Sequence, residues 1–370
     1  MLHHPGRTHG IPNLALSSQE TAGRSCRGNG VLMTGLRERG RSTVAGALEE
    51  CLLSQTSADE GLLVAVSGGV DSLVLLQATA ELVSRAPRPL AAAHLNHNLR
   101  GAASAQDAEL VRQSAARLGV RLFESCLSAG ELEFDSAGSL EDAARKARLK
   151  FLVRTAEEQQ FPVVLTAHHA ADQAETILHN ILRGSGLKGL RGIPISRILG
   201  PGVRVLRPLL DVSKQELEGF ARERAIAFAV DETNTDLRFT RNRIRHDLLP
   251  RLRQQFNPTI EDALLRLADQ SAELLDLADG LADELLRKAV LQEDEKSCRL
   301  SVPELMVAPD AILRHALVRL WDRRGWSRQH LRAAHWHRAA ALVRTTGSSD
   351  FPGGIRLQCS GGVLRMIRVD

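Results

Sequence analysis

The chain has 370 residues, of which 43% are hydrophobic and 25% are charged, and this length and composition favour two globular domains. They exclude a chain that is disordered throughout and a collagen-like repeat. The five cysteines lie far apart without a CxxC pair, which argues against a disulfide framework, a zinc ribbon and an iron–sulfur site. No stretch approaches the roughly 18 apolar residues of a membrane span, so we expect a cytoplasmic protein with reduced thiols and no membrane partner.

The basic residues are almost all arginine, with 42 Arg and six Lys behind a formal net charge of +4. Arginine binds phosphate through two parallel hydrogen bonds, which suits binding to nucleic acid. The same excess is also a mark of a GC-rich genome. With no Tyr and 3% aromatic residues, a base-stacking fold of the RRM type is disfavoured.

Hydrophobic patterning divides the chain into four parts. Residues 1–40 lack periodicity and are expected to be a disordered extension. Residues 41–250 alternate short apolar runs with helical segments, a pattern typical of βαβ units. The predicted fold is therefore α/β, a doubly wound and mostly parallel five-stranded sheet, with its strands near 61–66, 89–95, 120–127, 162–167 and 203–206. Residues 251–290 predict a long linking helix, and 291–370 a small, mainly helical domain that ends in a β-hairpin.

A glycine turn follows the first predicted strand directly, in the sequence Val66-Ser-Gly-Gly-Val-Asp-Ser72. Glycines at a strand-to-helix junction let the backbone approach a phosphate, and the first helical N–H groups favour an anion. Asp71 would repel a bare phosphate, so it indicates a Mg²⁺ ion between carboxylate and phosphate. The turn is neither a Walker A loop nor GxGxxG. The predicted nucleotide site consists of Ser67, Gly68, Gly69, Val70, Asp71 and Ser72.

Polar segments fall at the ends of four further predicted elements. They are His94–Gly101, the Leu140–Arg148 segment, Ala167–Thr176 with the glycine-rich 183–192 stretch after it, and Asp231–Asn234 with the basic run at 238–253. The glycine-rich stretch is expected to be a mobile loop. His94 and His97 either contact the adenosine or the target base or are satisfied by backbone groups, and the sequence does not decide between these alternatives.

Together with the glycine turn, these segments resemble, in the same order, the tRNA(Ile)-lysidine synthetase family of the ATP-pyrophosphatase (PP-loop) superfamily. Two positions depart from the family pattern. Ala171 replaces the first Asp of HHxDDQxET, which removes one acidic contact, and Leu149 stands where the family tends to carry Tyr.

The resemblance implies an ATP-dependent ligase that joins the ε-amine of free L-lysine to C2 of the wobble cytidine in the isoleucine tRNA with a CAU anticodon. ATP first adenylates the cytidine O2, and AMP then leaves. It implies ATP and Mg²⁺ as cofactors, with Asp71 as the metal ligand, and tRNA binding by the C-terminal domain. It also allows a homodimer.

The resemblance assigns roles to further residues. Asp71, Asp172 and Glu175 are the expected catalytic residues, and His168, Asp172 and Glu175 would bind lysine. The two carboxylates are three apart and share a helix face, so they would equally cap the helix dipole or, with His168, bind a metal. Phosphates of ATP or tRNA would be bound by Arg145, Arg148, Arg241, Arg243 and Arg245, for which a solvated helix face is the alternative.

Two other functions remain open at this point. A PP-loop tRNA thiolase would need an essential cysteine, and Cys126 is the only one within the predicted strands of the sheet. A non-catalytic nucleotide-binding module would bind ATP without releasing pyrophosphate when tRNA and lysine are added.

Overall fold

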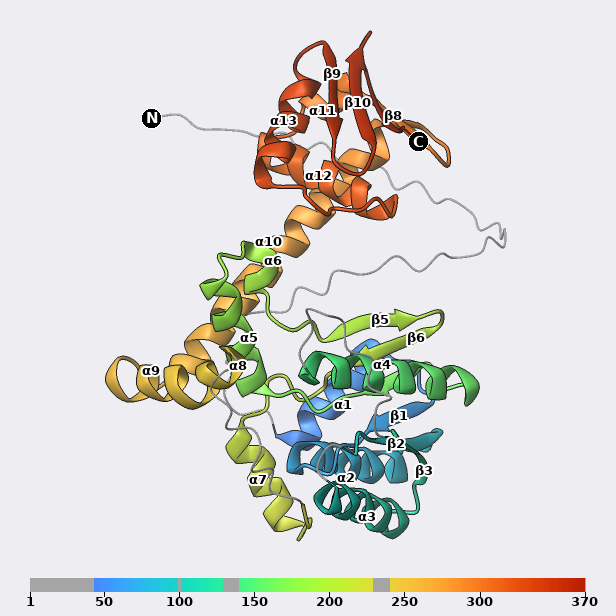
Figure 1. Cartoon of the computed structure of the whole chain (residues 1–370), viewed down its shortest axis with the longest axis vertical. Helices are drawn as coiled ribbons and strands as arrows, with labels where there is room; N and C mark the ends of the chain where they lie inside the picture. Colours follow the sequence, from blue (N-terminus) through green and yellow to red (C-terminus); the bar gives the residue numbers. More distant parts are fainter. Residues whose placement is uncertain (1–42, 99–100, 129–139, 229–239, 370) are drawn as a thin grey trace, which may run out of the picture. The chain divides into compact units, whose positions relative to one another are not determined.

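The computed structural model describes residues 43–98, 101–128, 140–228 and 240–369 (Figure 1). The predicted extension at 1–40 and the Asp231–Asn234 segment lie outside these residues. Among the described helices, none has both the length and the apolar character needed to cross a membrane.

The first sheet has six strands in the order β3-β2-β1-β4-β6-β5. All neighbouring pairs are parallel except the edge pair of β5 and β6, which is antiparallel. The predicted doubly wound, mostly parallel sheet is thus confirmed, with one strand more than expected. Its strands are β1 (Leu62–Ala65), β2 (Leu90–Asn96), β3 (Arg121–Cys126), β4 (Val163–Leu165), β5 (Ser196–Gly200) and β6 (Val203–Leu206).

Helices cover both faces of this sheet (Figure 1). One face packs in a single apolar cluster with α1 (Val44–Gln55), α2 (Val70–Arg85), α3 (Ala102–Arg117) and α7 (Lys214–Glu223). The other face packs against α4 (Leu140–Glu158), whose Phe151 and Leu152 belong to the same apolar cluster as the strand residues Leu63 and Val164. Burial on both faces explains why the central strands are continuous apolar runs rather than alternating ones.

Strand β1 lies between β2 and β4, so the chain winds away from β1 in both directions. The carboxyl ends of β1 and β4 therefore meet at a topological switch point, where open α/β sheets bind their ligands. The glycine turn follows β1 here, and α5 (Ala170–Leu182) begins a few residues after β4.

A helical segment follows the first sheet, formed by α8 (Thr240–Arg243), the π-helical turn η1 (Ile244–Leu248), α9 (Leu249–Gln255) and α10 (Ile260–Ala289). Residues of α5, η1, α9 and α10 share an apolar cluster that includes Ile177, Ile244 and Leu264. The long helix expected at 251–290 is present as α10, but it begins only at Ile260, and residues 251–255 belong to the separate helix α9. Its N-terminal half packs against α5 and the short helix α6 (Leu187–Leu190).

The C-terminal region carries a second, antiparallel sheet in the order β7-β8-β11-β10-β9. The predicted terminal hairpin is confirmed as β10 (Ile355–Ser360) and β11 (Val363–Arg368), but it belongs to a larger sheet with β7 (Val290–Glu293), β8 (Ser297–Ser301) and β9 (Gly347–Phe351). Its core surrounds the fully buried Trp321 and includes residues of α11 (Val302–Met306), α12 (Asp310–Arg323) and α13 (Ala333–Val343). The additional strands are short and polar on one face, which hides them from a search for apolar runs.

Candidate nucleotide and substrate site

The glycine turn is held in shape by its two serines. Ser72 Oγ accepts a hydrogen bond from Ser67 N at 3.1 Å and donates one to Gly69 O at 2.9 Å. Gly68 has φ +96°, a conformation in which a side chain would be strained, and a Cβ there would lie 3.2 Å from Asp107. Helix α2 has Gly69 as its N-cap, and no side chain caps it. Its first N–H groups therefore remain available to an anion.

Asp71 lies in the first turn of α2 and contacts two cationic or basic groups from distant segments. The Nζ of Lys214 donates to its Oδ1 at 2.7 Å, and the Nε2 of His169 lies 3.7 Å from its Oδ2. Lys214 is the first residue of α7, which follows β6. Lys214 was not among the site residues expected from the sequence, although its place directly after the helix cap Ser213 sets it at the end of a strand-to-helix connection.

The start of α5 places the two expected lysine-binding carboxylates side by side. His169 is the N-cap and forms a capping box with Asp172, whose Oδ2 accepts from His169 N at 3.0 Å. The predicted role of Asp172 in capping the helix is therefore realised in the structure. Burial raises the pKa of Asp172, but His169 and its backbone N–H outweigh that effect and hold the pKa below its ordinary value. Ala171 lies in the same turn, where its N–H donates to His169 Nδ1.

Two arginines of the basic run neutralise these carboxylates. Arg245 Nη2 donates to Glu175 Oε2 at 3.0 Å and to Asp172 Oδ1 at 3.2 Å. Arg241 Nε donates to Glu175 Oε2 at 3.4 Å. Glu175 is only 1% exposed, so its charge is compensated by the guanidinium groups rather than by water. The structure thus brings Arg241 and Arg245 to the carboxylates that were expected to bind lysine.

Arg243 is exposed, and its hydrogen bond is a long one, from Nη2 to Thr240 Oγ1 at 3.5 Å, rather than one to the carboxylates of α5. Among the described residues it forms no ion pair. In contrast, Arg251 and Arg253 at the far end of the run pair with Asp247 and Glu261.

A second group of cations surrounds His168, just after β4. Burial lowers the pKa of His168 to about 4, Asp172 opposes this, and Arg207, Arg148 and Arg145 lower it further. The imidazole is therefore neutral at pH 7. Its Nδ1 lies 3.1 Å from Thr166 Oγ1, and a hydroxyl that donates there leaves the proton on Nε2, free to donate to a ligand.

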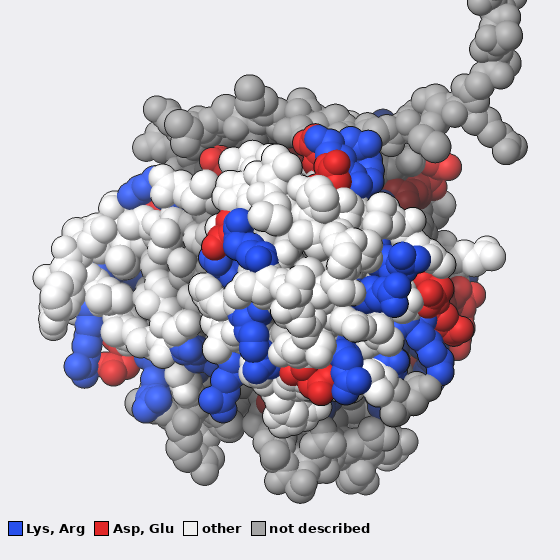
Figure 2. All heavy atoms as spheres, turned by 90° about the horizontal axis from the view of Figure 1, so that it is seen from above, with Lys and Arg blue, Asp and Glu red and all other residues white. Residues whose placement is uncertain are grey.

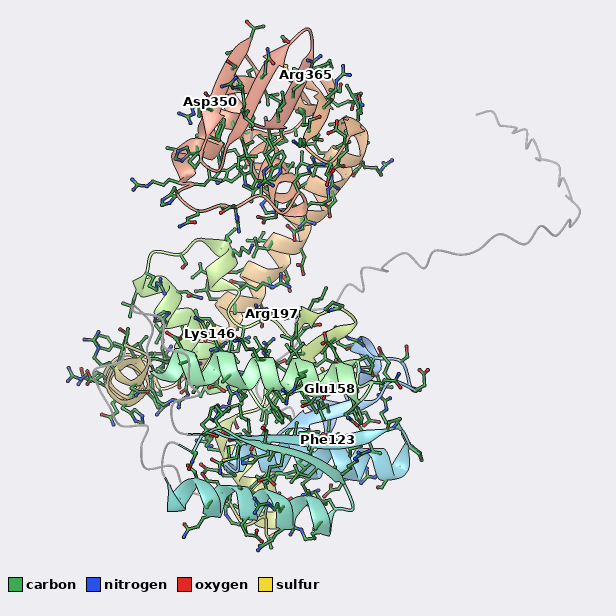
Figure 3. The ribbon with its side chains drawn as sticks, turned by 45° about the vertical axis from the view of Figure 1, so that its right-hand side comes forward. Phe123, Lys146, Glu158, Arg197, Asp350 and Arg365 are labelled. Carbon is green, nitrogen blue, oxygen red and sulfur yellow. The ribbon has the colours of Figure 1, made fainter. Side chains whose placement is uncertain are left out.

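Arg207, directly after β6, is the most buried member of this group at 7% exposure. Burial lowers its pKa to about 10, and Arg197 and Arg145 add to the effect. Its Nη1 donates to Pro194 O at 2.7 Å, whereas its buried Nε has no partner among the described residues. Figure 3 shows Arg197 on β5 beside α4, the helix that carries Arg145 and Arg148.

The charge of this group is unbalanced. Within the described part of the chain, no carboxylate pairs with Arg145, Arg148, Arg197 or Arg207. Of these four arginines only Arg207 is buried, and a buried cation without a counter-charge is costly unless an anion is bound. Arg207 was not among the residues expected from the sequence to form the site, although it follows β6 directly, at the same edge of the sheet as the segment that follows β4.

His94, within strand β2, and His97, directly after that strand, are held by backbone groups. His94 Nδ1 lies 2.9 Å from Val66 O and His97 Nε2 lies 3.0 Å from Ala144 O. One ring nitrogen of each is thus engaged with backbone, in line with the second alternative. The buried Nε2 of His94 has no partner within the described ranges.

The glycine-rich stretch after α5 contains the helix α6 instead of a continuous loop. Gln173 binds both backbone groups of Ile193, accepting from its N–H at 2.7 Å and donating to its carbonyl at 2.9 Å. Asn180 Nδ2 donates to Gly189 O at 2.8 Å. These contacts fasten the stretch to α5.

The described residues contain no cluster of three or more His, Cys, Asp or Glu side chains that would hold a metal ion by themselves. A single carboxylate such as Asp71 nevertheless suits Mg²⁺, which is commonly bound by one or two carboxylates together with substrate phosphates. The thiol of Cys126 is exposed on the edge strand β3.

A protein-family profile described as the PP-loop domain matches residues 42–252. The U34-tRNA thiolase of Methanococcus maripaludis, solved with its [4Fe-4S] cluster, superposes with a TM-score of 0.51 over 61% of this chain and 78% of that chain. At 16% identity, this likeness concerns the fold alone.

Several proteins of known function are more similar in sequence to this chain than the thiolase is. The tRNA(Ile)-lysidine synthases of Geobacter sulfurreducens and Symbiobacterium thermophilum are 38% and 37% identical over 68% and 83% of this chain, respectively. The matches cover 53% and 65% of those relatives, so the chain spans between about half and two thirds of their length. The Gloeobacter violaceus tRNA(Ile)-lysidine synthase is 38% identical over 73% of this chain and 78% of the relative. The chain therefore belongs to the PP-loop domain family and, within it, to the tRNA(Ile)-lysidine synthase family.

Proposed function

We propose that this chain uses ATP to ligate lysine to C2 of the wobble cytidine in the isoleucine tRNA with a CAU anticodon, a carbon–nitrogen ligase reaction. Family membership supports this function, as the matched relatives carry that name. The structural observation that supports this function is that the glycine turn lies close to the carboxylate pair of α5. The phosphate-binding turn and the carboxylate pair of α5 are joined through His169, which is near both Asp71 and Asp172.

In the first step, O2 of the cytidine attacks the α-phosphate of ATP, which forms an adenylated cytidine and releases pyrophosphate. The turn from Ser67 to Ser72 binds the tail phosphates through its N–H groups and hydroxyls. Arg145, Arg148 and Arg207 provide positive charge where negative charge develops on the phosphates. Mg²⁺ held at Asp71 supplies further charge neutralisation there when it is bound.

In the second step, the ε-amine of lysine attacks C2, loses a proton and expels AMP. A carbonyl oxygen is a poor leaving group, and adenylation turns it into a good one. Asp172 and Glu175 hold the lysine ammonium and accept its proton. Arg245 lies between them in the structure described here, so lysine binding displaces its guanidinium toward a phosphate of the nucleotide or the tRNA.

We further propose that the C-terminal region, residues 291–370, binds tRNA, as does the exposed Arg243. Figure 2 shows Lys and Arg spread over the visible face of the molecule rather than gathered in one patch. Such a distribution suits a broad contact with a phosphate backbone, which positions nucleic acid without reading its sequence.

The decisive assay measures incorporation of labelled lysine into unfractionated tRNA with and without ATP. We expect ATP-dependent labelling by the wild type, loss of labelling in Asp71→Ala, and full labelling in Cys126→Ser. Pyrophosphate release without lysine incorporation, or dependence on Cys126, would contradict the proposal and favour thiolase chemistry. ATP binding without pyrophosphate release would indicate a non-catalytic module.

A further inference from the structure

Helices α2 and α7 run side by side with two ion pairs between them. At their N-terminal ends Lys214 Nζ donates to Asp71 Oδ1 at 2.7 Å, and near their C-terminal ends Arg224 Nε donates to Glu81 Oε1 at 2.8 Å. Both pairs join residues that are 143 apart in sequence. The helices are therefore parallel and in register, and the two pairs are equivalent in geometry.

Because the two ion pairs are similar, a comparison of them distinguishes a structural role of Lys214 from a functional one. Apolar side chains between the helices, among them Leu217 and Phe220 of α7, belong to the same core cluster as Leu73 and Leu76 of α2. This packing holds the helices together. The side chains of Lys214 and Asp71 are 41% and 30% exposed, and ion pairs of that exposure typically contribute only about 0–1 kcal/mol to folding.

Arg224 also lies over the Phe220 ring and pairs with Glu223, but the difference that bears on ligand binding is the distance of each pair from the glycine turn. Glu81 lies near the C-terminal end of α2, away from the glycine turn, whereas Asp71 lies in the first turn of α2, within the glycine turn that we propose receives the tail phosphates. A carboxylate at this place repels phosphate, and Lys214 is the ammonium that neutralises it in the ligand-free chain. A flexible, partly exposed ammonium on the first turn of a helix is free to turn from the carboxylate to a phosphate oxygen.

We infer that Lys214 is a phosphate-binding residue for the β- and γ-phosphates of ATP. With Mg²⁺ and nucleotide bound, Asp71 would ligate the metal instead of pairing with Lys214, and the Lys214 ammonium would contact the nucleotide tail. The inference rests on the proposed function, since it assumes that ATP binds at the glycine turn. It assigns Lys214 to binding of the tail and not to binding of the adenosine or the α-phosphate.

The test compares binding of two nucleotides, AMP and an ATP analogue with a non-hydrolysable α,β-bridge, by calorimetry in the presence of Mg²⁺. We expect Lys214→Met to weaken binding of the ATP analogue about tenfold, equivalent to 1.4 kcal/mol, and to leave AMP binding unchanged. Lys214→Arg should restore most of the affinity. The matched control is Arg224→Met, which removes the other α2–α7 ion pair and should change neither affinity.

Equal weakening of both nucleotides by Lys214→Met, or equal effects of Lys214→Met and Arg224→Met, would show that Lys214 only fastens α7 and would overturn the inference. Unchanged binding of both nucleotides would overturn it as well. These outcomes leave the proposed function intact if the wild type binds the analogue and labels tRNA with lysine. If the wild type does not bind the analogue, the proposed function fails, and the inference fails with it.

Discussion

Arg245 contacts Glu175 through both Nε and Nη2, and the same Nη2 reaches Asp172. Burial lowers the pKa of Arg245, but the hydrogen bonds and charges of these carboxylates outweigh it and raise the pKa overall. Arg245 lies in the π-helical turn η1, a widened turn of a kind that is frequent at functional sites. The contact fastens the start of α5 to a segment 70 residues away.

Glu175→Gln should destabilise the protein by about 1–3 kcal/mol, because the side chain stays the same size while Arg245 loses its main counter-charge. The measurement is the free energy of unfolding in urea. Glu261→Gln is the control, since it removes the carboxylate from an exposed pair with Arg253 and should cost no more than about 1 kcal/mol. Equal costs for the two variants would contradict the assigned importance of Glu175.

His168 should make the stability depend on pH. Its pKa is lowered to about 4 in the folded chain, chiefly by burial, whereas an unfolded histidine titrates near 6.5. The unfolded state therefore binds more protons between these values, and folding stability falls as the pH drops from 7 toward 4. Between pH 7 and 5 the loss from this residue is about 2 kcal/mol.

Unfolding curves at both pH values will test this expectation. His168→Gln should remove this part of the pH dependence, while the exposed His337→Gln should retain it. A pH dependence in His168→Gln as steep as in the wild type would show that the imidazole is not held neutral.

Arg207→Met should change the free energy of unfolding by less than about 1 kcal/mol in the absence of ligand. The variant loses a hydrogen bond to Pro194 O but also removes a buried cation whose Nε lacks a described partner, and these effects offset each other. Thermal stabilisation by ATP should decrease at the same time, because the anion loses a binding partner.

Arg204→Met, three residues earlier in β6, is the control for Arg207→Met. Arg204 pairs with Glu60 through both Nη atoms, so its loss should cost about 1–2 kcal/mol and leave the stabilisation by ATP unchanged. If Arg207→Met were the more destabilising of the two and kept the full ATP effect, Arg207 would be a structural residue.

Gly192→Ala should destabilise the α5–α6 region by about 2–4 kcal/mol. Gly192 has φ +73°, and a Cβ would lie 2.3 Å from Gln173 Oε1, the atom that accepts from Ile193 N. Gly184 has φ +70° with open space around it. Gly184→Ala is therefore the control that measures only the free energy of backbone strain, about 1–2 kcal/mol. Equal costs for the two variants would show that the Gln173 contacts contribute nothing.

The sequence by itself determined the parallel sheet, the glycine turn after β1 and the long helix α10. Each depends on a local signal, namely a fully apolar strand, a Ser-Gly-Gly motif at a strand end or leucines at helical spacing. Local signals also located Asp71, His168, Asp172 and Glu175 at the ends of strands that had to meet at one edge. The edge strand β5 and the strands β7, β8 and β9 carry weak signals, because short strands with one polar face do not form an apolar run.

Tertiary structure alone decided which charges meet. Lys214 pairs with Asp71 because α7 packs on α2, and Arg245 pairs with Glu175 because η1 packs on α5. Strand β6 pairs with β4, which places Arg207 at the carboxyl end of the sheet. Arg207 is buried there, and no carboxylate of the described chain pairs with it. Such pairings join residues 66 to 143 positions apart in the sequence. The hydrophobic periodicity of a single segment does not predict them, because electrostatic energy depends on distance in space and on burial rather than on separation along the chain.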